Sequence, residues 1–167
     1  MNSGHDAFEI RAARCADAAD IMHVRREAIL AKSASHYDPV ILNDWADAGD
    51  AGRMAKRISD PDYRALVAEA GGDIIGFAMA AISEHELQAL YVKPNPIGKV
   101  GTALLAAIEA LAFQAVPYLV CEASLNAEGF YKAHGYIEEC RKDQVSSSGD
   151  MISRMVQMRK HRPNAGR

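Results

Sequence analysis

Apolar residues recur along the chain with two periods, one typical of strands and one typical of helices. Apolar and charged residues alternate over 8–12, which predicts a first strand. Apolar residues recur every three or four positions over 17–29, with charged residues between them, which predicts an amphipathic helix. A second helical region over 40–58 is interrupted between Gly49 and Gly52. The first third of the chain is therefore expected to be one strand followed by helices.

The middle of the chain predicts three antiparallel strands. Two apolar runs, Arg64–Glu69 and Ile74–Ile82, are joined by a Gly-Gly-Asp turn at 71–73, a strong hairpin signal. A third run, His85–Val92, follows after a short link. Three neighbouring strands with short connections indicate an antiparallel meander.

The second half predicts two more helices and three more strands. The helix Thr102–Ala115 is apolar on nearly every side, so we expect it to lie buried against a sheet. The strand Tyr118–Ala123 should run parallel to the strand before that helix, because a helix connects the two. A short helix, Ser124–His134, precedes a closing strand pair, Tyr136–Cys140 and Asp150–Met158. The order β-α-α-β-β-β-α-β-α-β-β predicts an α+β fold, with a central mixed, mostly antiparallel sheet flanked by helices.

The connection between the third run and the long apolar helix is the first candidate site. Pro94 and Pro96 end the strand, since neither offers an N–H to a neighbour. Gly98 and Gly101 allow the backbone to come close to a ligand. The first N–H groups of a helix are unpaired and carry partial positive charge, so such a turn suits a phosphate. The spacing fits neither a Walker A loop nor a Rossmann fingerprint, and an ordinary strand–helix connection is the alternative.

This turn resembles the acetyl-CoA-binding motif of the GNAT N-acetyltransferase superfamily. Residues 92–105 read V-K-P-N-P-I-G-K-V-G-T-A-L-L, similar to the family form V-x-P-x-x-R/Q-G-x-G-x-G-x-x-L-L. The turn lacks the basic or Gln residue and is one residue and one glycine short. The resemblance implies the family fold and acetyl-CoA as co-substrate, without a metal. The implied cofactor-binding residues are Leu90, Tyr91, Val92, Ile97, Gly98, Lys99, Val100, Gly101, Thr102, Ser124, Asn126 and Tyr131.

A second stretch, residues 124–136, resembles the family pattern N/S-x-x-A-x-x-F-Y-x-x-x-G-F/Y. Ser124 matches the position that contacts the CoA arm in the family, and a plain helix N-cap is the alternative. Asn126 is expected to cap the helix or to contact CoA. Tyr131 matches the family's general acid: a phenol with a pKa of about 10 stays protonated at neutral pH and can donate to a departing thiolate. The alternative for Tyr131 is a core aromatic residue, and Phe130 is expected to pack in the core.

Glu86 is the candidate general base. It lies six residues before Val92, as does the family's catalytic glutamate where one exists, and could take the amine's proton directly or through water. A solvated carboxylate at a strand end is the alternative. Glu84 and His85 are adjacent substitutes, although successive strand side chains point to opposite faces. The resemblance also implies that a backbone N–H, from Leu90 or Val92, polarises the thioester carbonyl.

The acceptor pocket is the least specific part of the prediction. His36, Tyr37 and Trp45 are candidates to line it, and loop and core packing is their alternative role. Arg25 and Arg26 are expected on a solvated helix face. The acceptor would be a small-molecule or peptide amine, attacking acetyl-CoA directly in a ternary complex. The rival class is a non-catalytic acyl-CoA-binding or ligand-sensing module on the same fold.

Length and charge narrow the class further. The 167 residues are expected to form one domain, with a frayed tail over 161–167. A hydrophobic content of 49% is typical of a globular protein, and a net charge of −3 does not favour nucleic acid as partner. Neither a signal peptide nor a membrane span is read. The three cysteines, Cys15, Cys121 and Cys140, lack metal-ligand spacing, which indicates reduced thiols and a cytoplasmic protein. A homodimer stays open.

Overall fold

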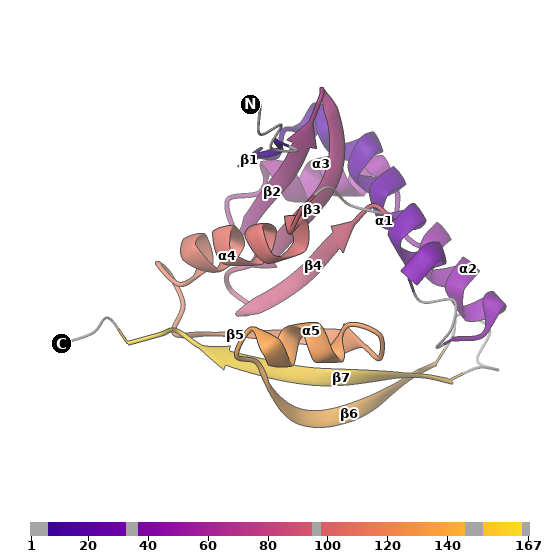
Figure 1. Cartoon of the computed structure of the whole chain (residues 1–167), viewed down its shortest axis with the longest axis vertical. Helices are drawn as coiled ribbons and strands as arrows, with labels where there is room; N and C mark the ends of the chain where they lie inside the picture. Colours follow the sequence, from indigo (N-terminus) through magenta and orange to yellow (C-terminus); the bar gives the residue numbers. More distant parts are fainter. Residues whose placement is uncertain (1–6, 33–36, 95–97, 146–151, 165–167) are drawn as a thin grey trace, which may run out of the picture.

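The computed structural model describes residues 7–32, 37–94, 98–145 and 152–164, and one sheet runs through them (Figure 1). Within these residues the sheet has seven strands in the order β1-β2-β3-β4-β5-β7-β6. The strands are β1 (Glu9–Ala12), β2 (Tyr63–Ala70), β3 (Asp73–Ala81), β4 (Glu86–Val92), β5 (Tyr118–Ser124), β6 (Ile137–Val145) and β7 (Ile152–His161). Each neighbouring pair is antiparallel except β4 and β5, so the predicted parallel pair is confirmed.

The helices follow the predicted order, with one more helix in the first third. They are α1 (Ala18–Lys32), preceded by the short 3₁₀ turn η1 (Cys15–Asp17), α2 (Pro39–Asp47), α3 (Ala51–Ser59), α4 (Val100–Ala112) and α5 (Glu128–Ala133). The second predicted helical region is two helices, because Asp38 and Asp50 each begin one by accepting a backbone N–H in the first turn. None of the helices in the described residues is long and apolar enough to span a membrane.

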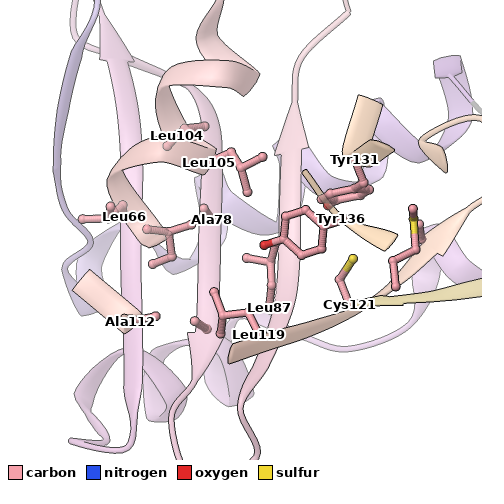
Figure 2. Packing of buried hydrophobic residues seen from close by; sticks show 14 of the residues in the cluster. Leu66, Ala78, Leu87, Leu104, Leu105, Ala112, Leu119, Cys121, Tyr131 and Tyr136 are labelled. Carbon is pink, nitrogen blue, oxygen red and sulfur yellow. The ribbon is translucent and has the colours of Figure 1, made fainter. Parts of the chain in front are cut away.

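Two apolar clusters cover the two faces of β2 and β3. Successive strand residues point to opposite faces, so Leu66 and Ala78 lie in one cluster while Val67 and Phe77 lie in the other. The first cluster includes Leu104, Leu105 and Ile108 of α4, which Figure 2 shows in part. The second includes residues of α1 and α3. Helix α4 thus covers one face and α1 and α3 the other (Figure 1), as the apolar surface of α4 predicted.

Strands β4 and β5 touch at one end and then separate. Their register contains a single pair, Glu86 opposite Val120, and the Val120 N–H donates to the His85 carbonyl at 2.8 Å. Beyond that pair, no strand of the described residues pairs with the edge of β4 that faces β5. The sheet therefore opens between its two halves, and this opening holds the candidate site.

Two sequence-based boundaries are corrected by the structure. The third predicted strand begins at Glu86, because His85 has a φ of +54°, which belongs to a turn and not to a strand. The predicted frayed tail is wrong at its first two residues: His161 pairs with Tyr118 in the β5–β7 ladder, and the Arg162 N–H donates to the Pro117 carbonyl at 2.8 Å.

Candidate active site

Two adjoining cavities fill the opening between β4 and β5. The first, of about 210 Å³, reaches toward α1 and α2, and the second, of about 240 Å³, reaches toward the start of α4. They share six lining residues from four elements and the turn before α5, namely Ile29, Leu90, Tyr91, Ser124, Ala127 and Tyr131. The two cavities therefore form one cleft that crosses the sheet opening from side to side.

Tyr131 lies where the two cavities meet. Its side chain is 7% exposed, and its ring packs 5.3 Å from the ring of Tyr136, beside Cys121 (Figure 2). Burial, reinforced by nearby Cys121, Tyr91 and Glu109, holds the pKa of Tyr131 well above its ordinary value. No hydrogen bond from the Tyr131 hydroxyl to another described residue is found. The hydroxyl is thus a neutral proton donor that lines a cleft.

Helix α5 holds both aromatic residues of the second motif at this cleft. Phe130 also lines the second cavity and its ring lies 4.4 Å from that of His134. The expectation that Phe130 packs against the core is confirmed, but it also lines the cleft, and Tyr131 lies in the same core cluster as well as in the cleft. Both side chains can reach the cavity because α5 starts directly after β5, so its first full turn lies over the opening.

Six other predicted cofactor-binding residues line the second cavity. They are Leu90, Tyr91 and Val92 of β4, Gly101 of α4, Ser124 of β5 and Asn126 of the following turn. A Cβ atom built on Gly101 would lie 3.7 Å from Val92 Cγ2 and 3.8 Å from the Phe130 ring, which is ordinary contact. The glycine therefore leaves open space in the cavity without being required by the packing of the protein.

The other predicted turn residues that the structure describes do not line either cavity. Gly98 has a φ of +58°, the left-handed conformation that favours glycine, and Lys99 is exposed at the N-cap of α4. Val100 is fully buried in the core. Thr102 is half-buried on α4 outside the cavity lining. Ile97 lies outside the described residues.

Glu86 sits at the end of β4 beside the first cavity and is not one of its lining residues. Burial, and then the neighbouring carboxyl of Glu84, raise the pKa of Glu86 above its ordinary value. Gln88 lines the cavity and its Nε2 donates to Glu84 Oε2 at 3.2 Å and Glu86 Oε2 at 3.3 Å. Gln88 has no opposing residue in β3, since Ala89 pairs with Met79 and Leu87 with Ala80. Because of this β-bulge, the side chains that follow it point to the opposite sheet face from the one that regular alternation would give.

The predicted acceptor residues separate into one that lines the first cavity and one that supports it. Trp45 lines the cavity. The centroid of the Tyr37 ring lies 4.7 Å from the centroid of the Trp45 ring. Tyr37 is not a lining residue: its hydroxyl donates to the Arg154 carbonyl at 2.9 Å and accepts the Leu125 N–H at 2.8 Å. Tyr37 thereby ties α2 to both β7 and the turn after β5. His36 lies outside the described residues.

Arg25 is the charged residue that sequence reasoning missed. It was expected in solvent, but it lines the first cavity, and its guanidinium lies 5.8 Å above the Tyr91 ring. The signal available in the sequence was the spacing to Ile29, since residues four apart share one helix face. Arg26 fits the expectation: it is exposed and pairs with Asp47.

Cys121 also lines the first cavity, buried and 2% exposed, as predicted for a small apolar side chain. Burial raises its pKa to about 12, so the thiol is protonated at neutral pH. Within the described residues, no group of three or more His, Cys, Asp or Glu side chains could hold a metal ion.

The same fold recurs in solved structures. A GCN5-related N-acetyltransferase from Rhodopseudomonas palustris is 27% identical, with a TM-score of 0.83 over 96% of this chain and 99% of that one. A PaiA N-acetyltransferase from Thermoplasma acidophilum, solved with coenzyme A, is 23% identical, with a TM-score of 0.74 over 93% and 99%. A phosphinothricin acetyltransferase from Sinorhizobium meliloti, solved with acetyl-CoA, is 19% identical, with a TM-score of 0.71 over 95% and 94%.

No curated protein matches the chain. A family model described as an acetyltransferase (GNAT) domain matches residues 33–161, which include both motifs and strands β4 and β5 on either side of the cleft. The chain therefore belongs to the GNAT acetyltransferase domain family and is an acyltransferase.

Proposed function

We propose that the protein is an N-acetyltransferase that moves the acetyl group of acetyl-CoA directly to an amine in a ternary complex. The observation that carries the proposal is the position of Tyr131, a neutral proton donor at the junction of two cavities. The second cavity, at the start of α4, would hold the CoA arm, and the first would hold the amine. Relatives solved with coenzyme A or acetyl-CoA support this choice of donor.

Strand β4 would bind the CoA arm through its free edge. Its N–H and C=O groups beyond Glu86 face no strand on the β5 side, and an extended ligand can pair with them as an added strand would. The N–H groups at the start of α4 would bind the pyrophosphate. Ser124 and Asn126 would contact the same ligand from the opposite side of the cleft.

Tyr131 would act as general acid. As the amine displaces the thioester sulfur, the tetrahedral intermediate expels a thiolate, and the Tyr131 hydroxyl gives up its proton to that sulfur. The high pKa of Tyr131 keeps the proton in place until the thiolate forms. A backbone N–H of β4, from Leu90 or Val92, would stabilise the oxyanion of the intermediate.

Glu86 would accept the amine's proton through water. Because its pKa is raised, its carboxylate is a stronger base than an exposed one. Transfer through an acetylated cysteine is disfavoured, because the cysteine in the cleft, Cys121, holds its proton up to a pH of about 12. The amine would therefore attack the thioester without a covalent enzyme intermediate.

The test is Tyr131→Phe, which removes one oxygen and keeps the ring. We expect turnover to fall roughly 10²-fold with acetyl-CoA affinity nearly unchanged, because the proton is needed only as the thiolate leaves. Thiol release measures turnover and calorimetry measures affinity. Undiminished turnover in this variant would remove Tyr131 from the mechanism.

The non-catalytic rival makes a different prediction for the wild-type protein. A ligand-sensing module would bind acetyl-CoA and release no thiol with any member of a broad amine panel. Cytoplasmic location stays a prediction from the sequence, which leaves homodimerisation open.

A further inference from the structure

We propose that the acceptor carries a carboxylate next to its amine, as a small amino acid does, and that Arg25 binds this carboxylate. The inference rests on the proposed function, since it assigns the acceptor of the same cleft. Three observations carry it: the unused donors of Arg25, an unpartnered acceptor atom on Gln88 of the same cavity, and the size and wall of the cavity.

Arg25 is held in place by one of its two terminal nitrogens. Nη1 donates to the Trp45 carbonyl at 2.7 Å and to the Ala48 carbonyl at 3.0 Å, both at the end of α2. A guanidinium carries five N–H donors, so Nε and Nη2 keep theirs. Those two nitrogens form the side-on fork that binds a carboxylate through two parallel hydrogen bonds.

The charge of Arg25 is not neutralised by the part of the protein that the structure describes. The ion pairs found there join other cations to carboxylates, whereas the hydrogen bonds of Arg25 go to carbonyl oxygens and its guanidinium lies over the Tyr91 ring. Arg25 also lines a separate cavity with Asp50, and no ion pair joins the two in the described residues. By contrast, the adjacent Arg26 pairs with Asp47. A half-buried guanidinium that lines a cavity without a carboxylate partner favours an anionic group in the ligand.

The opposite wall of the cavity suits an amine. Gln88 Oε1 is buried without a hydrogen-bond partner among the described residues, while Nε2 of the same side chain faces the carboxyls of Glu84 and Glu86. The amide orientation is set by those carboxyls, which accept and cannot donate when ionised. Oε1 therefore keeps unused acceptor capacity, and because the atom is shielded from solvent, a rotation of the Gln88 side chain would present it to a ligand N–H. Glu86, which accepts from Nε2 of the same amide, lies beside it. The cavity thus has a cationic end on α1 and an amine-binding end on β4.

Size and lining make the ligand a small one. The first cavity, at about 210 Å³, is smaller than the roughly 300–1,000 Å³ typical of sites for drug-sized ligands. Ile29, Trp45 and Met155 give it an apolar wall. A peptide N-terminus or a protein lysine carries no free carboxylate beside its amine. A free amino acid with a small apolar side chain offers a carboxylate to Arg25, an amine to the Gln88 and Glu86 side, and an apolar group to this wall.

The test compares leucine, leucinamide and isopentylamine as acceptors for acetyl-CoA, with thiol release as the readout. The amide lowers the pKa of the neighbouring amine toward that of a peptide terminus, about 7.7–8.0, so without a carboxylate site leucinamide should react faster. We expect the opposite: kcat/KM for leucine at least about tenfold above that for leucinamide, the scale of a charge-assisted contact. Equal or faster transfer to leucinamide or isopentylamine overturns the inference and leaves the transferase activity standing.

Variants then locate the carboxylate site. Arg25→Gln removes the carboxylate site and should bring the leucine-to-leucinamide ratio below one, since leucinamide has the less basic amine. Arg25→Lys, which keeps the charge without the fork, should leave an intermediate ratio. Arg26→Gln is the matched control on the same helix and should keep the wild-type ratio. Because Arg25 also holds the end of α2, circular dichroism is used to check that each variant folds. If Arg25→Gln does not fold, the ratio measured for Arg25→Lys decides whether Arg25 binds the carboxylate. A ratio unchanged in Arg25→Lys or Arg25→Gln overturns the assignment.

Failure of the proposed function is distinguishable from failure of this inference. If no amine is acetylated, calorimetry with 4-methylpentanoate in the presence of CoA tests the carboxylate site alone. Binding to the wild type and to Arg26→Gln, with at least tenfold weaker binding to Arg25→Gln, retains the site in a protein that is not a transferase. Absence of binding to the wild type overturns it.

Discussion

Gly101→Ala should separate cofactor binding from stability, because the structure predicts opposite signs for the two. The new methyl group meets only Val92 Cγ2 at 3.7 Å and the Phe130 ring at 3.8 Å, so the folded protein accepts it without a shift. Alanine also favours a helix over glycine by up to about 1 kcal/mol. The variant should therefore be as stable as the wild type or more so.

Acetyl-CoA should bind this variant more weakly. Gly101 lines the second cavity in the first turn of α4, where the N–H groups are proposed to meet the pyrophosphate. A methyl group at this position takes up space that the ligand needs, and we expect at least a tenfold loss of affinity, about 1.4 kcal/mol. Calorimetry with acetyl-CoA gives the affinity, and urea unfolding gives the free energy of unfolding.

Gly129→Ala is the matched control. Gly129 is likewise the second residue of its helix, α5, and no atom lies within 4 Å of the Cβ position. Neither a strand nor another part of the described protein accounts for this glycine. The same substitution there should raise stability slightly and leave acetyl-CoA affinity unchanged. Unchanged affinity in Gly101→Ala, or an equal loss in Gly129→Ala, would refute the placement of the CoA site at the start of α4.

Two further predictions concern stability. Lys160→Met should lower the free energy of unfolding by about 3–5 kcal/mol, because Glu109, 8% exposed, loses its partner at 2.7 Å. Lys132→Met, at an exposed pair, should lower it far less in the same urea unfolding experiment. Asp17→Asn should lower stability at pH 7 by about 1.5–3 kcal/mol. Hydrogen bonds from Arg11 hold the pKa of Asp17 below its ordinary value, so this stabilisation is present above the unfolded pKa of about 3.9 and is lost as the pH falls through the folded pKa. Wild type and Asp17→Asn should therefore converge in acid unfolding curves; a constant gap would show that the charge of Asp17 is not the cause.

Local patterns in the sequence determined the elements and their order. The period of apolar residues depends on a few neighbouring positions, so the β2–β3 hairpin, the buried helix α4 and the parallel β4–β5 pair could all be predicted. The motif spacing likewise placed Tyr131 on a short helix directly after β5. These features are carried by residues close together in the chain.

The chemistry of the first cavity was decided only by tertiary structure. Arg25 and Gln88 lie 63 positions apart, and nothing in either local sequence shows that α1 brings the guanidinium over β4 or that a bulge places Gln88 in the cleft. Nothing in the local sequence of Glu109 indicates its partner, because Lys160, whose Nζ donates to Glu109 Oε2, lies 51 positions away. A helical or strand period reports which face a residue occupies, but not which distant side chain covers that face. The charges that choose the acceptor are therefore set by the packing of α1 and β4 across the cleft.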